Sequence, residues 1–187
     1  TLEKRINGTH TTLQGPVNFE VVPLFEGALP RKSNQVINDF RKSVIAFQQD
    51  LTSTNISLSK SLKTTNAMLR ALNKASRPTK ELFKKLNDTK IILLNIDKEL
   101  HGNSIKDEIG ERSNPTASDG GSLGWTAFGN TYGPTEEHMR LLNRVKSQLK
   151  KVKKQLSPIV NSTLPILRNE LIKTGAPWIE GQGLIKD

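Results

Sequence analysis

The chain has 187 residues, enough to bury the core of one domain or one and a half, and it contains no cysteine. The missing cysteines exclude a disulfide framework, a thiolate metal site and a cysteine nucleophile, while a net charge of +10 makes anionic partners a class to consider. No stretch approaches the roughly 20 apolar residues that span a bilayer. The first residues lack the basic and apolar regions of a secretion signal. We therefore expect a soluble segment of a longer protein.

The N-terminal region has the pattern of β-strands. Leu2–Ile6 and Thr9–Leu13 flank Asn7-Gly8, a dipeptide that accepts the positive φ angles of a tight hairpin turn. Apolar and polar residues then alternate over 17–21, so two or three antiparallel strands are predicted, ending near Leu24. A hairpin this small is marginally stable alone. It either packs on the helices or forms the edge of a β-sandwich whose other strands lie upstream, and we favour the sandwich edge.

Three long stretches place apolar residues at alternating three- and four-residue spacings, which is typical of helices that pack lengthwise. The first helix is predicted from Ser33-Asn34 to about Ser76, and the hydroxyl-rich residues 52–61 allow a break within it. Arg77-Pro78 ends this helix, Pro78-Thr79 opens the second, and the second stops at Gly102. The short connection makes the two helices antiparallel neighbours. The residues expected to face inward are Ile37, Phe40, Val44, Phe47, Leu51, Leu58, Leu62, Leu69 and Leu72 on the first helix, and Leu82, Phe83, Leu86, Leu93, Ile96 and Leu100 on the second.

A third helix is predicted from Thr135, a good N-cap, to Lys173, with Leu142, Val145, Leu149, Val152, Leu156 and Ile159 as its inward seam. Pro158 and Pro165 predict a kink, or a break with Ser162 or Thr163 capping a second segment. The preceding connection, residues 103–134, is rich in Gly, Ser, Asn and Pro. We expect it to wrap back over the helices, held there by the aromatic side chains of Trp125, Phe128 and Tyr132.

These elements predict a mainly α protein. Residues 30–187 form an antiparallel three-helix bundle with up-down-up topology, and residues 1–29 form a strand segment before it. The glycine-rich C-terminal tail is expected to fold back and cap the bundle through Trp178, and a ligand site around Trp178 is the less favoured reading.

The residues that could carry chemistry are few. His10, His101 and His138 show no metal-ligand spacing, and we interpret all three as surface histidines. The neighbouring acids Asp107/Glu108 and Glu136/Glu137 rarely converge as an acid and a base, and the second pair suits a helix start. The sequence therefore predicts no catalytic residue, no cofactor and no metal site.

A basic run on the third helix is the strongest charge feature. No acid occurs from His138 to Asn169. The cations of the predicted helix face are Arg140, Arg144, Lys146, Lys150, Lys151, Lys153 and Lys154. This face could bind phosphates or an anionic polysaccharide, or it could be a solvated surface whose long side chains cover apolar atoms, which we favour.

The chain contains, in this order, the strand 15–24, the loop 111–116, the helix start 133–135 and the closing residues 175–178, Gly181 and Gly183. This order of motifs resembles the C-terminal region of large bacterial sortilin-like proteins with Asp-box (BNR-type) β-propellers, often catalogued as glycosyl hydrolases. The stretch between Pro115 and Gly133 departs from the family pattern. The resemblance implies an exported, periplasmic or cell-surface protein, of which this chain is the last strands of an Ig-like sandwich and a helical bundle. Any catalytic residues would lie in the propellers.

The predicted role is a non-catalytic scaffold or protein-docking module, whose partners are the upstream domains of the same chain or another protein. Two alternatives from other classes stay open, and self-assembly through the apolar seams is a third. One is a module that binds an anionic polymer through the basic face. The other is an accessory part of a hydrolase, in which His138 or Glu137 reaches into an active site completed elsewhere.

Overall fold

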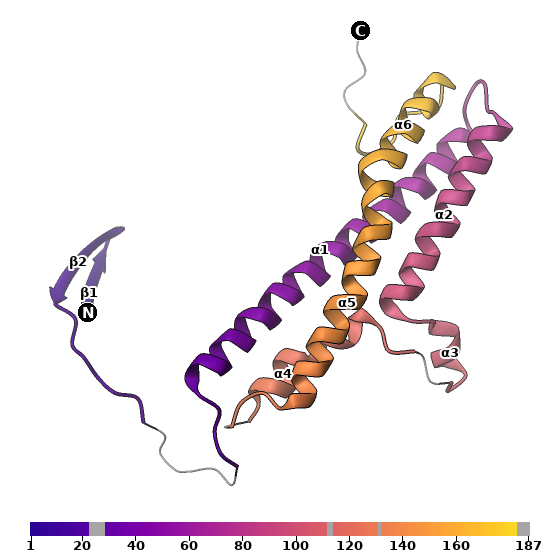
Figure 1. Ribbon diagram of the computed structural model, residues 1–187. Coiled ribbons are helices and arrows are strands. Elements are labelled where there is room, and N and C mark those ends of the chain that lie inside the picture. The colour runs from indigo at the N-terminus through magenta and orange to yellow at the C-terminus, as the bar shows by residue number, and fades with distance from the viewer. Residues whose placement is uncertain (23–28, 112–113, 131, 183–187) are drawn as a thin grey trace. The chain divides into compact units, whose positions relative to one another are not determined.

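The computed structural model describes residues 1–22, 29–111, 114–130 and 132–182, with the side chains of Ser104 and Asp107 left out. The chain divides into two compact units, residues 1–30 and 31–187. It is mainly helical, with a short two-stranded antiparallel sheet at the N-terminus (Figure 1).

The first unit is a β-hairpin. Strand β1 (Leu2–Ile6) pairs antiparallel with β2 (Thr9–Gln14). Asn7 and Gly8 take positive φ angles of 47° and 82°, so the predicted tight turn is confirmed. Residues 15–22 form no strand, because no neighbouring segment in the described ranges pairs with them, so of the two or three predicted strands the described residues contain two. The predicted end of the strand region near Leu24 lies outside the described residues.

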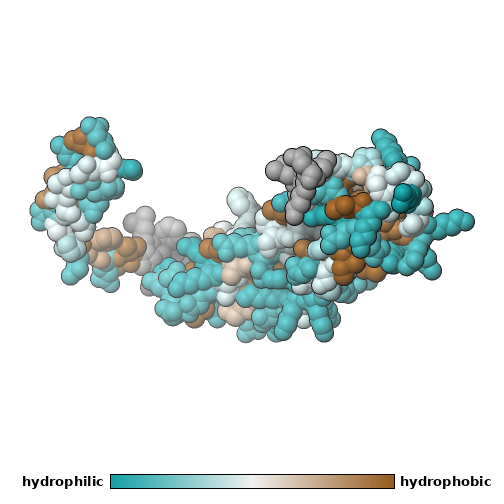
Figure 2. All heavy atoms as spheres, turned by 90° about the horizontal axis from the view of Figure 1, so that it is seen from above, coloured by the Kyte–Doolittle hydropathy of each residue, from teal (hydrophilic) through white to brown (hydrophobic). Residues whose placement is uncertain are grey.

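The hairpin leaves its apolar side chains exposed. The pairing of Ile6 with Thr9 and of Lys4 with Thr11 puts Leu2 and Ile6 on one face, while Glu3 and His10 lie on the other. Figure 2 shows such residues as brown spheres at the surface of this unit. The large hydrophobic residues of this unit that are more than half exposed are Leu2, Ile6, Leu13, Val17, Phe19, Val21, Val22 and Leu29.

The second unit is built on three long helical segments, which lie side by side in Figure 1. Helix α1 (Asn34–Leu72) begins at Ser33, whose Oγ accepts a hydrogen bond from the Val36 backbone N–H at 3.3 Å. Helix α2 (Lys80–His101) begins in the same way at Thr79 and ends at Gly102, whose φ is 94°. The predicted helix starts and the stop at Gly102 are therefore confirmed. The break expected within residues 52–61 is absent, because tertiary packing of the inward face overrides the weak propensity there.

The third segment runs through helix α5 (Glu136–Pro158), a π-helical turn labelled η2 (Ile159–Thr163) and helix α6 (Leu164–Lys173). The expected cap by Ser162 or Thr163 is not made: Thr163 has helical φ and ψ angles and gives no side-chain cap. The backbone N–H of Leu164 bonds instead to the carbonyl of Ile159, five residues back. This wider turn gives the ring of Pro165 room against the preceding turn, so the helix continues through a π-bulge, and the break predicted as the alternative to a kink does not occur.

The connection between α2 and α5 contains three short helices: α3 (Ser104–Glu108), the 3-10 helix η1 (Ala117–Ser122) and α4 (Leu123–Phe128). Ala117, Leu123 and Ala127 are completely buried against α1 and α5, so the expected wrapping is confirmed for residues 117–128. Phe128 packs edge-on against Phe40 with ring centroids 6.0 Å apart.

Two aromatic residues depart from the predicted packing. Trp125 is 88% exposed, because Leu123 and Ala127, one helical turn apart, occupy the inward side of α4. Phe83 is 43% exposed, because it lies about 100° around α2 from Leu82, which takes the inward position.

The core consists of two clusters along the helices. One joins the first part of α1 to the second half of α2, to α5 and to the connection, and the other joins the end of α1 to the start of α2 and to α6. Between them lie Ser61, Thr65 and Thr89, all buried, whose hydroxyls donate to the carbonyls four residues back at 2.7–2.8 Å.

The C-terminal tail folds back on the second cluster. Gly175 has a φ of 68°, and the carbonyl of Thr174 accepts from the backbone N–H of Arg77 at 3.0 Å. Ile179 is the buried residue of the tail, while Trp178 is 54% exposed. Thus the fold-back is confirmed, but Ile179 rather than Trp178 fills the apolar position. Within the described ranges, the helices lack the combination of length and apolar character that would cross a membrane.

Candidate functional site

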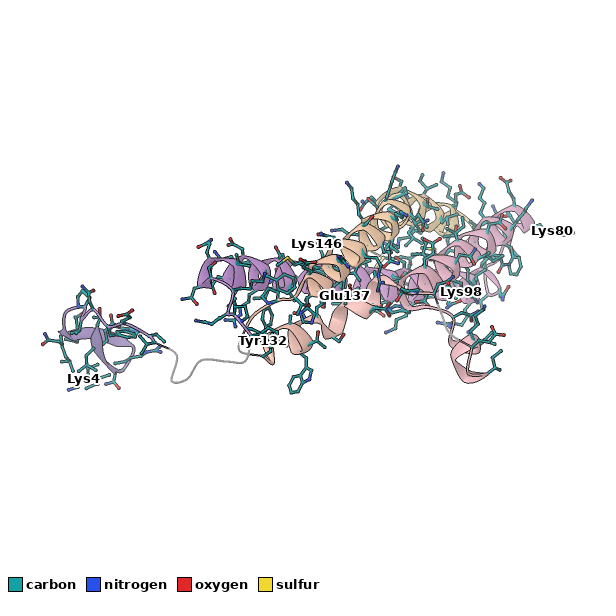
Figure 3. All side chains as sticks on the ribbon, turned by 60° about the horizontal axis from the view of Figure 1, so that its bottom comes forward. Lys4, Lys80, Lys98, Tyr132, Glu137 and Lys146 are labelled. Carbon is teal, nitrogen blue, oxygen red and sulfur yellow. The ribbon has the colours of Figure 1, made fainter. Side chains whose placement is uncertain are left out.

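Helix α5 presents its cations to solvent, as the seam of Leu142, Val145, Leu149, Val152 and Leu156 faces the core. All seven cations of the predicted face are exposed. Figure 3 shows Lys146 and Glu137 on this helix. Its solvent face is therefore basic from Arg140 to Lys154, after the acidic first turn.

Three of the seven cations are partly neutralised by acids. Arg140 lies 3.5 Å from Glu136 and 3.8 Å from Glu137, and Arg144 lies 3.8 Å from Asp119. Lys153 reaches across to Asp50 on α1 at 2.9 Å. The other four have no acidic partner within 4 Å in the part of the chain that the structure describes, and they are Lys146, Lys150, Lys151 and Lys154.

The first groove beside this face lies between α1 and α5, and we name it the α1–α5 groove. It is a hollow of about 300 Å³. Its lining residues are Ala46, Phe47 and Asp50 from α1 and Lys146, Leu149, Lys150 and Lys153 from α5. Phe47 and Leu149 are each 2% exposed and form an apolar floor, while the lysines stand along one wall.

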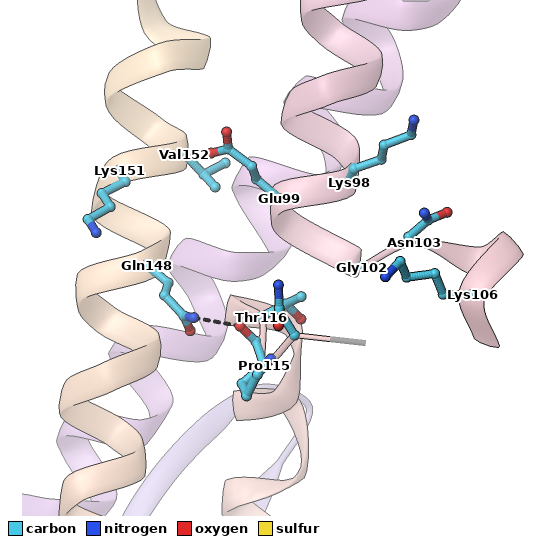
Figure 4. Close-up of a pocket in the computed structure, with 11 residues that line it drawn as sticks. Lys98, Glu99, Gly102, Asn103, Lys106, Pro115, Thr116, Gln148, Lys151 and Val152 are labelled. Atoms are coloured by element: carbon cyan, nitrogen blue, oxygen red, sulfur yellow. Dashed lines mark hydrogen bonds between the residues drawn. The ribbon is translucent and has the colours of Figure 1, made fainter. Parts of the chain in front are cut away.

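A second groove, the α2–α5 groove, lies where the end of α2 and residues 114–116 meet α5 (Figure 4). It measures about 400 Å³. Gln148 crosses it and donates from Nε2 to the carbonyl of Pro115 at 2.6 Å, while its Oε1 is buried without a hydrogen-bond partner. Lys98, Lys106 and Lys151 line the groove with the single acid Glu99 among the lining residues. Lys106 also pairs with Glu111 at 3.3 Å, so part of this positive charge is compensated.

The histidines make local contacts. His101 bridges Asp97 and Asn55, each at 2.9 Å, and so links the end of α2 to the middle of α1. His138 and Thr135 form a reciprocal cap at the start of α5, with the backbone N–H of Thr135 donating to Nδ1 at 3.2 Å. His10 lies 3.5 Å from Glu3 on the hairpin. No group of three potential metal ligands occurs among the residues that the structure describes.

The Glu136/Glu137 pair is not arranged as an acid and a base. Glu136 and Glu137 lie in the first turn of α5, where the helix dipole and Arg140 stabilise their charge. Glu108 is exposed on α3, and the side chain of Asp107 lies outside the described set.

Lys85 has a raised pKa. Hydrogen bonds from its ammonium group to Glu170 on α6 and then to Glu81 on α2 raise its pKa above the ordinary lysine value of 10.5. The ammonium lies 3.1 Å from Glu170. This exposed contact joins two helices and indicates a structural role.

The predicted aromatic residues separate into distinct environments. Phe128 is packed, with the Arg41 guanidinium 5.0 Å from its ring centroid. Tyr132 is half-buried, and its carbonyl accepts from the backbone N–H of Lys32 at 2.9 Å. Trp125 and Trp178 stay exposed, on different elements, so the structure does not assemble one aromatic site.

Sequence reasoning missed the groove residues Ala46, Asp50 and Gln148. Ala46 and Asp50 are spaced four apart beside Phe47, so the helical period could have placed them on the flank of the seam. No sequence signal specified which helix they would face. Comparisons of the chain with protein-family models, with curated proteins and with solved structures found no match.

Proposed function

We propose that this chain is a non-catalytic helical module that acts as a scaffold or protein-docking element. In this proposal α1, α2 and the α5–α6 segment form an antiparallel three-helix bundle with up-down-up topology. The short connection between α1 and α2, two long helices with apolar seams, favours an antiparallel pair, and the long α2–α5 connection lets the chain return along the bundle before α5. The N-terminal hairpin joins the module to a β-sandwich of a larger exported β-propeller protein.

The contrast between the two units carries the proposal. The helical unit buries its own apolar seams in two clusters, whereas the hairpin exposes most of its large hydrophobic residues. A two-stranded hairpin is marginally stable in water and needs more strands or a packing surface. A module that joins two parts of a protein would have these properties, because its helical unit is stable alone and its sheet needs strands from a neighbouring domain.

The resemblance of the motif order to the C-terminal region of sortilin-like β-propeller proteins supports the exported context. The test is to raise an antibody against this chain and to measure the size and the compartment of the native protein in its source cells. We expect an exported protein much larger than the 20.8 kDa of this chain. A cytoplasmic band near 20.8 kDa would refute the proposal.

Binding of an anionic polymer is a second candidate, favoured by the four cations of α5 that have no acidic partner among the described residues. Such binding would weaken steeply as salt rises, because phosphate or carboxylate contacts release counterions. Replacing Lys150, Lys151, Lys153 and Lys154 by Gln would then abolish it. Salt-independent binding, or none, would remove this candidate.

A further inference from the structure

The α1–α5 groove has a regular row of charge along one wall. Lys146, Lys150 and Lys153 follow each other at intervals of four and three residues on α5. With a rise of about 1.5 Å per residue, their backbone positions are about 6 Å and 4.5 Å apart along the helix axis. Ligand groups bound to them would therefore lie about one helical turn apart.

The charge of this row is only partly compensated. Asp50 holds Lys153 at 2.9 Å, but Lys146 and Lys150 have no acidic partner among the residues that the structure describes. Helix α5 cannot supply one by an i,i+4 pair, because the sequence has no acid from His138 to Asn169. The carboxylates of a bound ligand would supply the acidic partners that Lys146 and Lys150 lack among the described residues.

The rest of the groove distinguishes a peptide from a polyanion. The small side chain of Ala46 is exposed above a floor of Phe47 and Leu149, so an apolar group can be seated there. A polyanion would contact the lysine wall alone and would leave the apolar part of the groove unfilled. A peptide can instead alternate acidic and apolar residues along the groove.

We propose that the α1–α5 groove binds an acidic amphipathic peptide segment of a partner protein. Carboxylates of the segment pair with Lys146 and Lys150, and an apolar side chain between them packs on Ala46. Binding of this kind is the helix-in-groove mode of recognition. The inference rests on the proposed docking role and names the partner class for it.

The test is a selection of random 16-residue peptides on the full 187-residue chain, followed by fluorescence anisotropy with the enriched peptides. We expect enrichment of Asp and Glu around an apolar residue. The double variant Lys146→Gln/Lys150→Gln should weaken binding by about tenfold or more, since two charge-assisted contacts are lost. The control Lys151→Gln/Lys154→Gln removes the same charge from α5 outside this groove and should change the affinity less than about threefold.

A second variant separates the apolar contact from the charge. Ala46→Phe keeps an exposed helix position and fills the groove, so it should abolish peptide binding while circular dichroism stays unchanged. Heparin is the polyanion probe. Equal weakening by both lysine doubles, with heparin bound more tightly than any peptide and unaffected by Ala46→Phe, would overturn the inference in favour of a polyanion site.

Enrichment of peptides without acidic residues, or no enrichment, would also overturn it. These outcomes are distinct from failure of the proposed function, which is decided by the size and compartment of the native protein.

Discussion

At the residue scale, Gly120 shows how closely the α2–α5 connection packs on the helices. A Cβ atom built on Gly120 would collide with the ring of Phe47 and lie 2.9 Å from Cγ2 of Val145. We predict that Gly120→Ala lowers the free energy of unfolding by about 1–3 kcal/mol, because overpacking forces buried neighbours to move. Urea unfolding followed by circular dichroism measures this change.

The adjacent Gly121 provides the control. A Cβ atom at Gly121 meets nothing within 4 Å, so Gly121→Ala should change the free energy of unfolding by less than about 0.5 kcal/mol. Equal effects of the two substitutions would show that η1 does not pack against α1 and α5 as described.

Thr65 tests the polar layer between the two core clusters. Its side chain is completely buried, and Oγ1 donates to the carbonyl of Ser61 at 2.8 Å. That carbonyl also has its helical backbone partner, so removing the hydroxyl leaves no unsatisfied donor. We predict that Thr65→Val leaves stability unchanged or raises it by up to about 1 kcal/mol, through added apolar burial.

Thermal unfolding monitored at 222 nm provides the measurement. The control is Thr52→Val, at an exposed position of the same helix, for which no gain in stability is expected. A loss above about 1 kcal/mol for Thr65→Val would mean that the hydroxyl does more for the core than its helical bond indicates.

Single aromatic residues mark the limit of what residue type alone can predict. Phe128 and Trp125 lie three residues apart, and both were expected to hold the connection. Only Phe128 packs, because the direction of each side chain depends on where α4 begins and on which side Leu123 and Ala127 occupy. Nothing local in the sequence fixes the start of so short a helix.

At the element scale, the long helices and their caps were predictable for local physical reasons. Ser33, Thr79 and Thr135 satisfy free N–H groups of the first helical turns, and Gly102 takes a positive φ angle that other residues avoid. For the π-bulge at Ile159–Thr163, the sequence predicted a kink or a break in the helix but not this form of it. The positions of the prolines identify which helical hydrogen bonds are lost. The backbone conformation that accommodates this loss depends on how both flanking helices pack.

The contact between α2 and α6 gives a pH-dependent prediction. Because the folded-state pKa of Lys85 is raised by Glu170 and then by Glu81, its contribution is complete below the ordinary lysine pKa of 10.5. It is lost as the pH rises through the raised value. We expect Lys85→Gln to lower Tm slightly at pH 8 and to match the unsubstituted chain when both are measured well above pH 10.5.

Lys84, the neighbouring lysine on the same helix, is the control for general charge effects. Lys84→Gln should leave Tm nearly unchanged at both pH values. A deficit of Lys85→Gln that persists at high pH would attribute the effect to packing of the lysine stem rather than to the ion pair.

At the scale of the whole molecule, the helical class and the terminal hairpin followed from period and turn chemistry, but the grooves did not. A groove depends on the rotation of two helices about their axes. The pairing of Asp50 with Lys153 joins residues about a hundred positions apart in the sequence. Long-range geometry of this kind is set by the combined packing of Phe47, Leu149 and their neighbours, and no local pattern contains it.

The division into two units leads to the last prediction. Both core clusters consist of described residues of the helical unit. We therefore expect residues 31–187 expressed alone to unfold within about 2 °C of the Tm of the full chain, since no core contact is removed. The isolated peptide of residues 1–22 should show little strand content by circular dichroism, because two strands without a covering layer are marginally stable. A fall in Tm well beyond this range would show that the hairpin stabilises the helices, and the exposed side chains of Leu2 and Ile6 would then have their covering surface within this chain rather than in a partner sheet.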